Sequence, residues 1–345
     1  MRYESILKRV MRDKAAPLII ILIVFTIFTM VVSSGVLDGE PLSSMFTKGF
    51  MTSGNLLGVF YNMVIRIVMM CGIACIFIGG NIDLSVGAQA SLATMVFAMI
   101  VRSAAFPWPV AVVLTLMVAA CFGLANTFLV NFLKFPPFIA TIGMASVYTG
   151  ICKVVTEGEN IQISQQKAGL FLEIGKAHIF GRFPVIFIFA VLLVAAYQFM
   201  LSKTTFGRSI YMCGGNPGAA RLSGLNPDKI RMILFINNSV LAAVAGLLWT
   251  SQLKLASPTA IINAAPDLQV ISAAILGGIS FGGGGGHLGG ALVAVLLLGV
   301  FDNMLSVLGV QSYWNVFAQG LLLAVALIFD YISTERRRKA LLLRG

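Results

Sequence analysis

An acidic residue with polar neighbours is the strongest chemical signal in this chain. In the segment Gly79–Ala88, GGNIDLSVGA, Asp83 stands between two long apolar stretches, with Asn81 and Ser85 close by. If those stretches cross a membrane, a charge there costs roughly 2.5–3.5 kcal/mol and needs a reason. Either the glycines end one helix and Asp83 caps the next, or a glycine-interrupted helix pair exposes polar groups along a transport route. The two readings are compatible.

Three further polar residues interrupt apolar stretches. Asp302 and Asn303 are adjacent, and we expect them either to line a polar cavity or to bond to a neighbouring helix. The long side chain of Arg66 favours reaching the membrane surface over a place in a pathway. A transporter driven by an ion gradient favours paired intramembrane acids. Only Asp83 and Asp302 are candidates for such a pair, and Arg66 is the one obvious cation for them.

A second glycine-rich break lies in the C-terminal half. It begins with Gly277 and Gly278 and runs through five consecutive glycines, residues 282–286, to His287. The run is not a phosphate-binding loop, because no Gly-Lys-Ser/Thr follows it and no soluble strand precedes it. We expect a hinge or a tight reversal, with His287 as a loop residue rather than a proton relay.

The sequence carries no catalytic constellation. It has no Ser/His/Asp or Cys/His set and no HExxH motif, and its two histidines stand in separate loops. The five cysteines lack metal-ligand spacing, so we expect neither a metal site nor a disulfide framework. The chain is predicted not to be an enzyme and to hold no cofactor, and the energy for any driven transport would come from another chain.

The elements that position these polar residues are expected to be membrane-spanning helices. Of 345 residues, 58% are hydrophobic and 11% are charged, with a mean hydropathy of +0.94. Since an average soluble domain is about 25% charged, an ordinary soluble enzyme is excluded. The segments lack the alternation of a barrel, which leaves an all-α, multi-pass protein. About ten spanning helices are expected, near 17–32, 56–79, 84–104, 108–132, 137–155, 184–202, 232–252, 267–280, 288–308 and 313–331. The segment 267–280 is short and ends in glycine, so a broken or re-entrant helix is an alternative there.

Basic residues set the expected sidedness. Lys and Arg gather at both ends of the chain and in 203–231, and ten crossings place all three regions in the cytoplasm. The net charge of +11 then reflects loops beside an anionic leaflet and needs no nucleic acid to explain it. We expect a cytoplasmic segment at 1–16, one transmembrane domain at 17–331 and a basic cytoplasmic tail at 332–345.

One long cytoplasmic loop lies within the chain, at 203–231, and reads KTTFGRSIYMCGGNPGAARLSGLNPDKIR. Asn216 is a good helix cap and Pro217 suits a first helical turn, so we expect a short helix over 218–223 that stops at Gly224. A short helix of small residues has little to bury against lipid. The loop therefore favours a docking element for a soluble partner, with Arg221 as a charged contact, over a solvated connector.

These motifs resemble those of a known family. The carrying segments are GGNIDLSVGA at 79–88, PFIATIGMASVYTG at 137–150, GRSIYMCGGNPGAARLSG at 207–224, the glycine region at 274–290 and the closing helix at 314–330. Together they resemble the permease subunits of bacterial ATP-binding-cassette importers for monosaccharides, from about residue 50 to 331. The third segment is the most specific, because its pattern is hard to obtain by chance.

The resemblance implies a multi-pass protein of the bacterial inner membrane, surrounded by lipid, that forms a pathway with a second copy or a close homologue. It implies two cytoplasmic ATPase subunits, or one fused ATPase, holding ATP and Mg, and a periplasmic or extracellular sugar-binding protein. The matching loop would sit in a groove of the ATPase, with coupling positions at Gly207, Arg208, Gly214, Gly215, Asn216, Ala219, Ala220, Arg221 and Gly224. Positions expected to border the pathway are Asn81, Asp83, Ser85, Gly277, Gly278, Asp302 and Asn303.

Two features depart from the family pattern. The run at 282–286 is more glycine-rich than the usual S-G-G-x-G, and the outer loop 157–183 matches no single substrate. The solute is therefore open among monosaccharides and related small polyols, and the family also includes permeases for a sugar-like signalling molecule, nucleosides and inositol. The alternative function is a stand-alone secondary transporter driven by an ion gradient.

Overall fold

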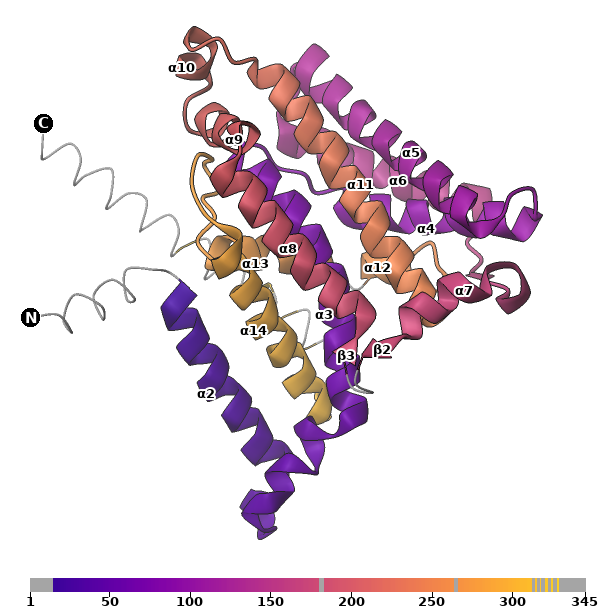
Figure 1. Cartoon of the computed structure of the whole chain (residues 1–345), viewed down its shortest axis with the longest axis vertical. Helices are drawn as coiled ribbons and strands as arrows, with labels where there is room; N and C mark the ends of the chain where they lie inside the picture. Colours follow the sequence, from indigo (N-terminus) through magenta and orange to yellow (C-terminus); the bar gives the residue numbers. More distant parts are fainter. Residues whose placement is uncertain are drawn as a thin grey trace, which may run out of the picture.

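The computed structural model describes residues 15–179, 183–263 and 266–311, with scattered positions between 314 and 328. In these ranges the chain is a bundle of long helices (Figure 1). Seven are long and apolar enough to cross a membrane. They are α3 (Ser53–Ile78), α4 (Val86–Ser103), α5 (Trp108–Thr127) with its π-helical continuation η4 (Phe128–Phe132), α6 (Pro137–Thr156), α8 (Val185–Lys203), α11 (Pro227–Leu253) and α14 (Leu288–Val307). The all-α, multi-pass class is confirmed.

Two further expected spans correspond to shorter apolar helices. α2 (Ala15–Ser33) lies beside α14, and α13 (Pro266–Leu276) follows the short α12 (Ala260–Asn263). At 1.5 Å per residue, the 11 residues of α13 measure about 16 Å, roughly half of a 30 Å hydrocarbon layer. The tenth expected span, 313–331, lies outside the described residues apart from scattered positions, and so does the tail at 332–345.

Helix α3 forms the centre of the bundle and packs against α8, α11, α13 and α14. Its C-terminal half is apolar on every side, and the hydrophobic side chains from Ile67 to Ile78 are fully buried. A helix that is hydrophobic all round belongs in a core. α11 packs against α3, α4 and α5 and so links this core to the second half of the bundle, where α6 covers α4 (Figure 1).

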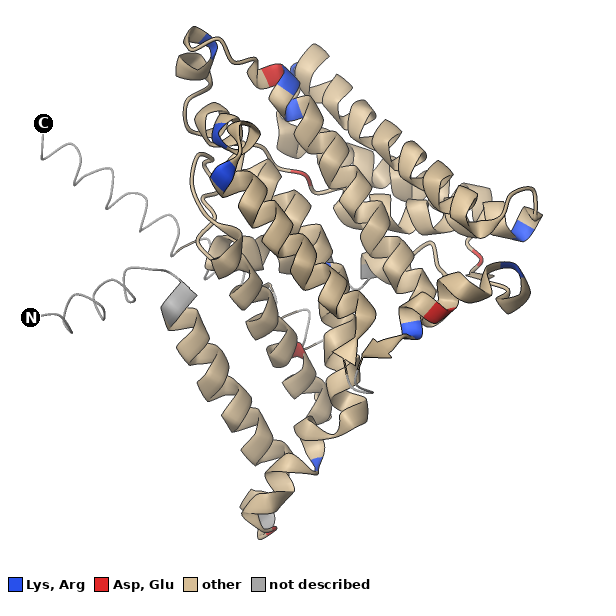
Figure 2. Cartoon of the chain, in the orientation of Figure 1, with Lys and Arg blue, Asp and Glu red and all other residues tan. Residues whose placement is uncertain are grey.

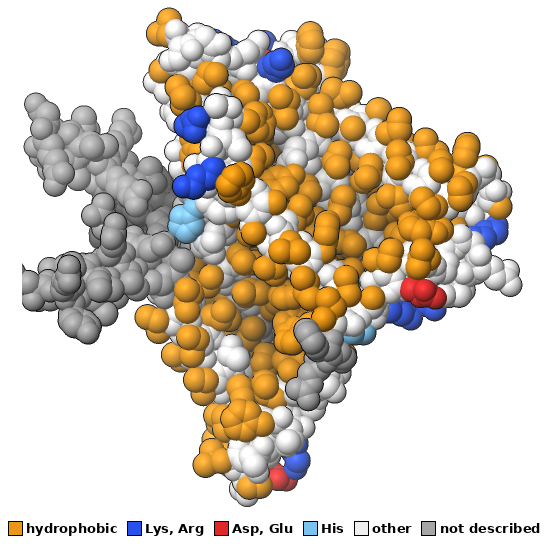
Figure 3. Space-filling view, viewed as in Figure 1, with side chains coloured by type: hydrophobic (Ala, Val, Ile, Leu, Met, Phe, Trp, Pro, Cys, Tyr) orange, Lys and Arg blue, Asp and Glu red, His pale blue; other side chains and the backbone are white. Residues whose placement is uncertain are grey.

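The outer helices present apolar side chains on their surface. Val113 on α5, Ile139 on α6 and Leu192 on α8 are among the exposed apolar residues. Hydrophobic side chains cover much of the face of the molecule in Figure 3. Charged residues gather at opposite ends of the molecule, and the long helices between them carry few (Figure 2). This distribution fits a protein that spans a bilayer, because charges avoid the hydrocarbon layer.

Short elements connect the helices. The turns η1 (Val36–Asp38), η2 (Leu42–Phe46) and η3 (Gly49–Met51) join α2 to α3. At the same end, α7 (Gln165–Lys176) lies between two antiparallel ladders, in which β1 (Ile161–Gln162) pairs with β4 (Leu255–Ala256) and β2 (His178–Ile179) pairs with β3 (Phe183–Pro184). At the opposite end, α9 (Thr205–Gly215) and α10 (Pro217–Leu222) connect α8 to α11 (Figure 1).

Candidate functional site

The segment formed by α9 and α10, here called the coupling segment, is built by two side-chain caps. Thr204 accepts a hydrogen bond from the Gly207 amide at 3.0 Å and begins α9. Asn216 accepts one from the Ala219 amide at 3.0 Å and begins α10, with Pro217 in the first turn. The helix cap predicted at Asn216 is confirmed. α10 ends before Gly224, whose φ of +81° lies in the left-handed region that glycine favours.

The predicted coupling residues divide into exposed and buried positions. Arg208, Gly215, Asn216, Ala219, Arg221 and Gly224 are exposed, whereas Gly207, Gly214 and Ala220 are buried in the chain. With 1% of its surface exposed, Ala220 is packed within this chain and does not face a partner. Leu222, which the sequence reading missed, is 93% exposed at the end of α10. The position of Leu222 in the short predicted helix between the cap Asn216 and Gly224 was the signal in the sequence that could have identified it.

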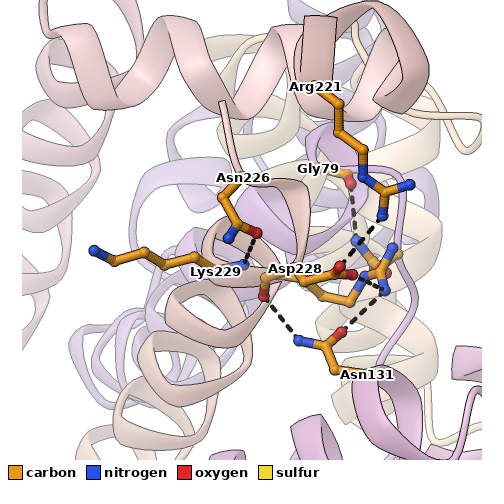
Figure 4. Close-up of polar contacts among 8 residues, drawn as sticks. Gly79, Asn131, Arg221, Asn226, Asp228 and Lys229 are labelled. Atoms are coloured by element: carbon orange, nitrogen blue, oxygen red, sulfur yellow. Dashed lines mark hydrogen bonds and ion pairs between the residues drawn. The ribbon is translucent and has the colours of Figure 1, made fainter. Parts of the chain in front are cut away.

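Arg221 makes an ion pair within the chain. Its Nη2 lies 3.2 Å from Asp228 Oδ2 on the first turn of α11, and Figure 4 shows the guanidinium turned toward that carboxylate. Arg221 is 60% exposed, so the pair contributes little stability but orients the side chain. The guanidinium predicted to contact a partner is therefore already engaged with Asp228.

A second set of contacts anchors the start of α11. Arg231 donates to Asn131 Oδ1 at 3.0 Å and lies 3.4 Å from Asp228 Oδ1. Asn131, in η4, donates to the Asp228 carbonyl at 2.8 Å (Figure 4). The connection between α10 and α11 is thus fixed to the end of α5. Sequence reasoning did not single out Asn131 or Asp228, because their partners come from helices distant along the chain.

Asp83 is the centre of a fully buried hydrogen-bond network. Its Oδ1 accepts from the Ser85 amide at 2.9 Å and from Ser85 Oγ at 2.5 Å. Its Oδ2 accepts from Asn238 Nδ2 on α11 at 3.0 Å and from Asn126 Nδ2 on α5 at 3.5 Å. Ser85 Oγ in turn accepts from Gln89 and Asn126. Every partner of the carboxylate is a donor, which suits a group that only accepts.

This network changes the interpretation of Asp83. Ser85 is the residue before α4, and Asp83 does not bond to the amides of the helix that follows it. The predicted helix cap is therefore wrong, because Asp83 bonds to side chains of α5 and α11 instead. Asn81 does serve the turn, since its Nδ2 donates to the Gly79 carbonyl at 2.8 Å. Tyr148 on α6 donates to Asn126 Oδ1 at 3.0 Å, so four helices meet around this network.

The other polar residues of the apolar stretches join α3 to α14. Arg66 Nη2 lies 2.7 Å from Asp302 Oδ2, and both side chains are mostly buried. The expectation that Arg66 extends to the membrane surface is therefore wrong, because a carboxylate on the neighbouring helix neutralises it at depth. Asn303 and Asn55 exchange two amide hydrogen bonds of 2.7 and 2.9 Å. Of the two readings for Asp302 and Asn303, bonding to a neighbouring helix is the one observed.

The glycine region turns the chain between α13 and α14. Gly277 lies so close to Ala291 and Gly290 that a Cβ would overlap their backbone, and Gly278 has a φ of +92°. The expected tight reversal is confirmed. His287 accepts from the Gly290 amide at 3.2 Å and begins α14. Among the described residues, no group of three or more His, Cys, Asp or Glu side chains could hold a metal ion.

The coupling segment thus lies at one end of the bundle, where helix caps, an ion pair and buried glycines hold it in place. The polar groups among the apolar helices, such as Asp83 and Asp302, bond to other polar side chains of the chain. Comparison with known families identifies the family of this chain. The family described as "Branched-chain amino acid transport system / permease component" matches residues 55–327. The chain belongs to this permease family.

Relatives of this permease span nearly the same length. It is 32% identical over 295 residues to the ribose import permease protein RbsC of Haemophilus influenzae, which covers 85% of this chain and 90% of the relative. It is 33% identical over 287 residues to RbsC of Bacillus subtilis, covering 83% and 88%. The autoinducer 2 import system permease protein LsrC of Photorhabdus luminescens is 33% identical over 277 residues, covering 79% and 80%. No solved structure matches the chain.

Proposed function

We propose that this permease is the membrane-spanning subunit of an ATP-driven importer that receives a monosaccharide or related small polyol from an external binding protein. The observation that carries the proposal is the family match over 55–327 together with relatives named for ribose and autoinducer 2 import. The substrate class follows those relatives, since the family description itself names branched-chain amino acids.

The subunit works with other chains. We place it in the bacterial inner membrane with ten spans and both termini in the cytoplasm, paired with a second copy or a close homologue. Two ATPase subunits, or one fused ATPase, hold ATP and Mg on the cytoplasmic side, and a periplasmic or extracellular binding protein selects the solute. The basic coupling segment at one end of the bundle supports this orientation, because cytoplasmic loops carry an excess of Lys and Arg.

Contact with the ATPase is assigned to the exposed face of α10. Asn216, Ala219, Arg221 and Leu222 present a cap, a methyl group, a cation and an apolar side chain to the cytoplasm. Ala220 holds the helix against the rest of the chain. ATP shifts the permease between outward and inward access only through a difference in affinity for the two states, so this contact persists in both.

The pathway lies between two permease copies. Asp83 and Ser85 are fully buried, and Asp302 and Asn303 are bonded to α3, so these groups shape and position the helices that border the route. The short α13 and the turn after Gly277 and Gly278 give the break in a helix that transporters place beside such a route.

A pull-down from native membranes tests the function. The permease is solubilised in mild detergent, and every retained protein is identified by mass spectrometry for wild type and for Arg221→Glu. We expect wild type to retain an ATPase. We expect Arg221→Glu to insert normally into the membrane but to lose sugar-stimulated ATP hydrolysis, because a second carboxylate would lie beside Asp228 and the cationic contact would be lost. Lys203→Glu is the control, an exposed charge reversal just before α9.

The alternative function is separated by the same preparation. Recovery of the permease alone from native membranes would contradict the importer proposal. Sugar uptake by proteoliposomes that contain this chain alone, under a proton or sodium gradient and without ATP, would establish the stand-alone secondary transporter instead. Unchanged ATP hydrolysis in Arg221→Glu would remove that residue from the coupling contact.

A further inference from the structure

Glycines from three distant segments meet where the coupling segment joins the membrane helices. Gly80 follows α3, Gly214 and Gly215 end α9, and Gly283 and Gly284 lie in the turn between α13 and α14. A Cβ on Gly283 would lie 2.6 Å from Gly214 O and 2.7 Å from Gly80 Cα. A Cβ on Gly284 would lie 2.5 Å from Gly215 Cα. No side chain separates these three backbones, and we call the five residues the glycine junction.

Hydrogen bonds connect the same three segments. The Gly284 amide donates to the Ile78 carbonyl at the end of α3 at 2.8 Å. Tyr211 on α9 donates through Oη to the Gly286 carbonyl at 2.7 Å. Gly214 lies so close to the Ile78 carbonyl that a Cβ would overlap it. Helix α9, the end of α3 and the α13–α14 turn are therefore held together by direct backbone contact.

Two contacts of the coupling segment with the rest of the chain differ in stiffness. The contact of α10 with α11 includes the ion pair of Arg221 and Asp228, and the long Arg221 side chain, which is 60% exposed, can change rotamer. The glycine junction has no side-chain rotamers to change. Gly283 and Gly284 have left-handed φ values of +84° and +69°, which residues with a Cβ rarely adopt. Close-packed contacts of this kind transmit a displacement instead of absorbing it.

We propose that the glycine junction is the route by which movement of the coupling segment reaches α3 and the α13–α14 turn. Gly80, Gly214, Gly215, Gly283 and Gly284 are positioning residues for transport, and they act through the central helix rather than through α11. The proposal rests on the proposed function, because it needs an ATPase that moves the coupling segment.

Hydrogen–deuterium exchange on the co-purified complex of permease and ATPase tests this route. Amide exchange is compared without nucleotide and after trapping with ATP, Mg and vanadate. In wild type we expect trapping to change exchange both in 205–222 and in 277–287. In Gly283→Ala and Gly284→Ala we expect the ATPase to be retained and the change to be confined to 205–222, with the response at 277–287 lost.

Two matched variants separate transmission from local strain. Gly285→Ala changes the same turn, but its Cβ has no atom nearer than 3.6 Å. Gly158→Ala imposes a comparable left-handed strain at φ +78° with nothing within 4 Å. Both are expected to respond as wild type does, because neither enters the junction.

Tyr211→Phe decides the question if the glycine variants do not fold. It removes only the hydrogen bond to Gly286 and adds no bulk, and we expect it to weaken the response at 277–287 while the ATPase stays bound. A wild-type response at 277–287 in the glycine variants or in Tyr211→Phe would overturn the proposal, as would a wild-type complex whose turn does not respond to trapping. Failure to recover any ATPase would instead overturn the proposed function.

Discussion

Substituting Asp83 by Asn distinguishes a structural hub from a helix cap. Asn and Asp cap helices about equally well, so a capping role predicts a change of under about 1 kcal/mol. In the observed network, Oδ1 faces the donors of Ser85 and Oδ2 faces the amide of Asn238, so an amide at this position turns its NH2 toward another NH2.

The size of the loss follows from the contacts. The carboxylate accepts from two donors of Ser85 and from Asn238 and Asn126, and Asn126 also donates to Ser85 Oγ. Asn238 Nδ2 is therefore the donor left without an acceptor. Leaving a buried donor unpaired and losing a charge-assisted hydrogen bond costs about 2–4 kcal/mol.

Thermal unfolding in detergent measures this loss. The permease is heated in steps, and the fraction that stays monodisperse in size-exclusion chromatography is recorded for wild type and for Asp83→Asn. We expect the midpoint to fall by about 4–16 °C, at the roughly 2–4 °C per kcal/mol typical of domains of 150–250 residues. Glu159→Gln, the same chemical change at an exposed carboxylate, is expected to leave the midpoint unchanged. A wild-type midpoint in Asp83→Asn would refute the hub interpretation and restore the cap.

Three further predictions use the same expressed permease. Arg66→Met should destabilise the chain by about 3–5 kcal/mol, because it leaves the Asp302 carboxylate buried without its cation, and the double variant with Asp302→Leu should recover most of the loss in thermal unfolding. Gly277→Ala should destabilise the chain by about 1–3 kcal/mol and so lower the unfolding midpoint, whereas Gly143→Ala, which has open space around it, should not. Equal midpoints for the two variants would contradict the close contact of Gly277 with α14. Leu222→Asp should abolish ATPase retention in the pull-down with no change in midpoint, and undiminished retention would exclude Leu222 from the interface.

The local features of the coupling segment could be read from the sequence. Asn216, Pro217 and Gly224 predict where α10 begins and ends, and the structure confirms them, because a cap, a first-turn proline and a left-handed glycine act within a few residues. Which face of α10 is available could not be read in this way. Ala220 is buried and Leu222 exposed because of how α10 lies against the bundle, a matter of tertiary packing.

Composition and local pattern by themselves determined that this chain is a bundle of membrane helices, where those helices lie, and that a capped helix interrupts them on one side. Only the tertiary structure decided which polar groups pair, because Asp83 meets Asn126 and Asn238, 43 and 155 residues away, and Arg66 meets Asp302 on another helix. The physical reason is that lipid is as apolar as the helix surfaces themselves, so hydrophobicity marks a helix for the membrane without marking its neighbours. Close backbone contact and hydrogen bonding select those neighbours, and both depend on residues that the linear pattern leaves far apart.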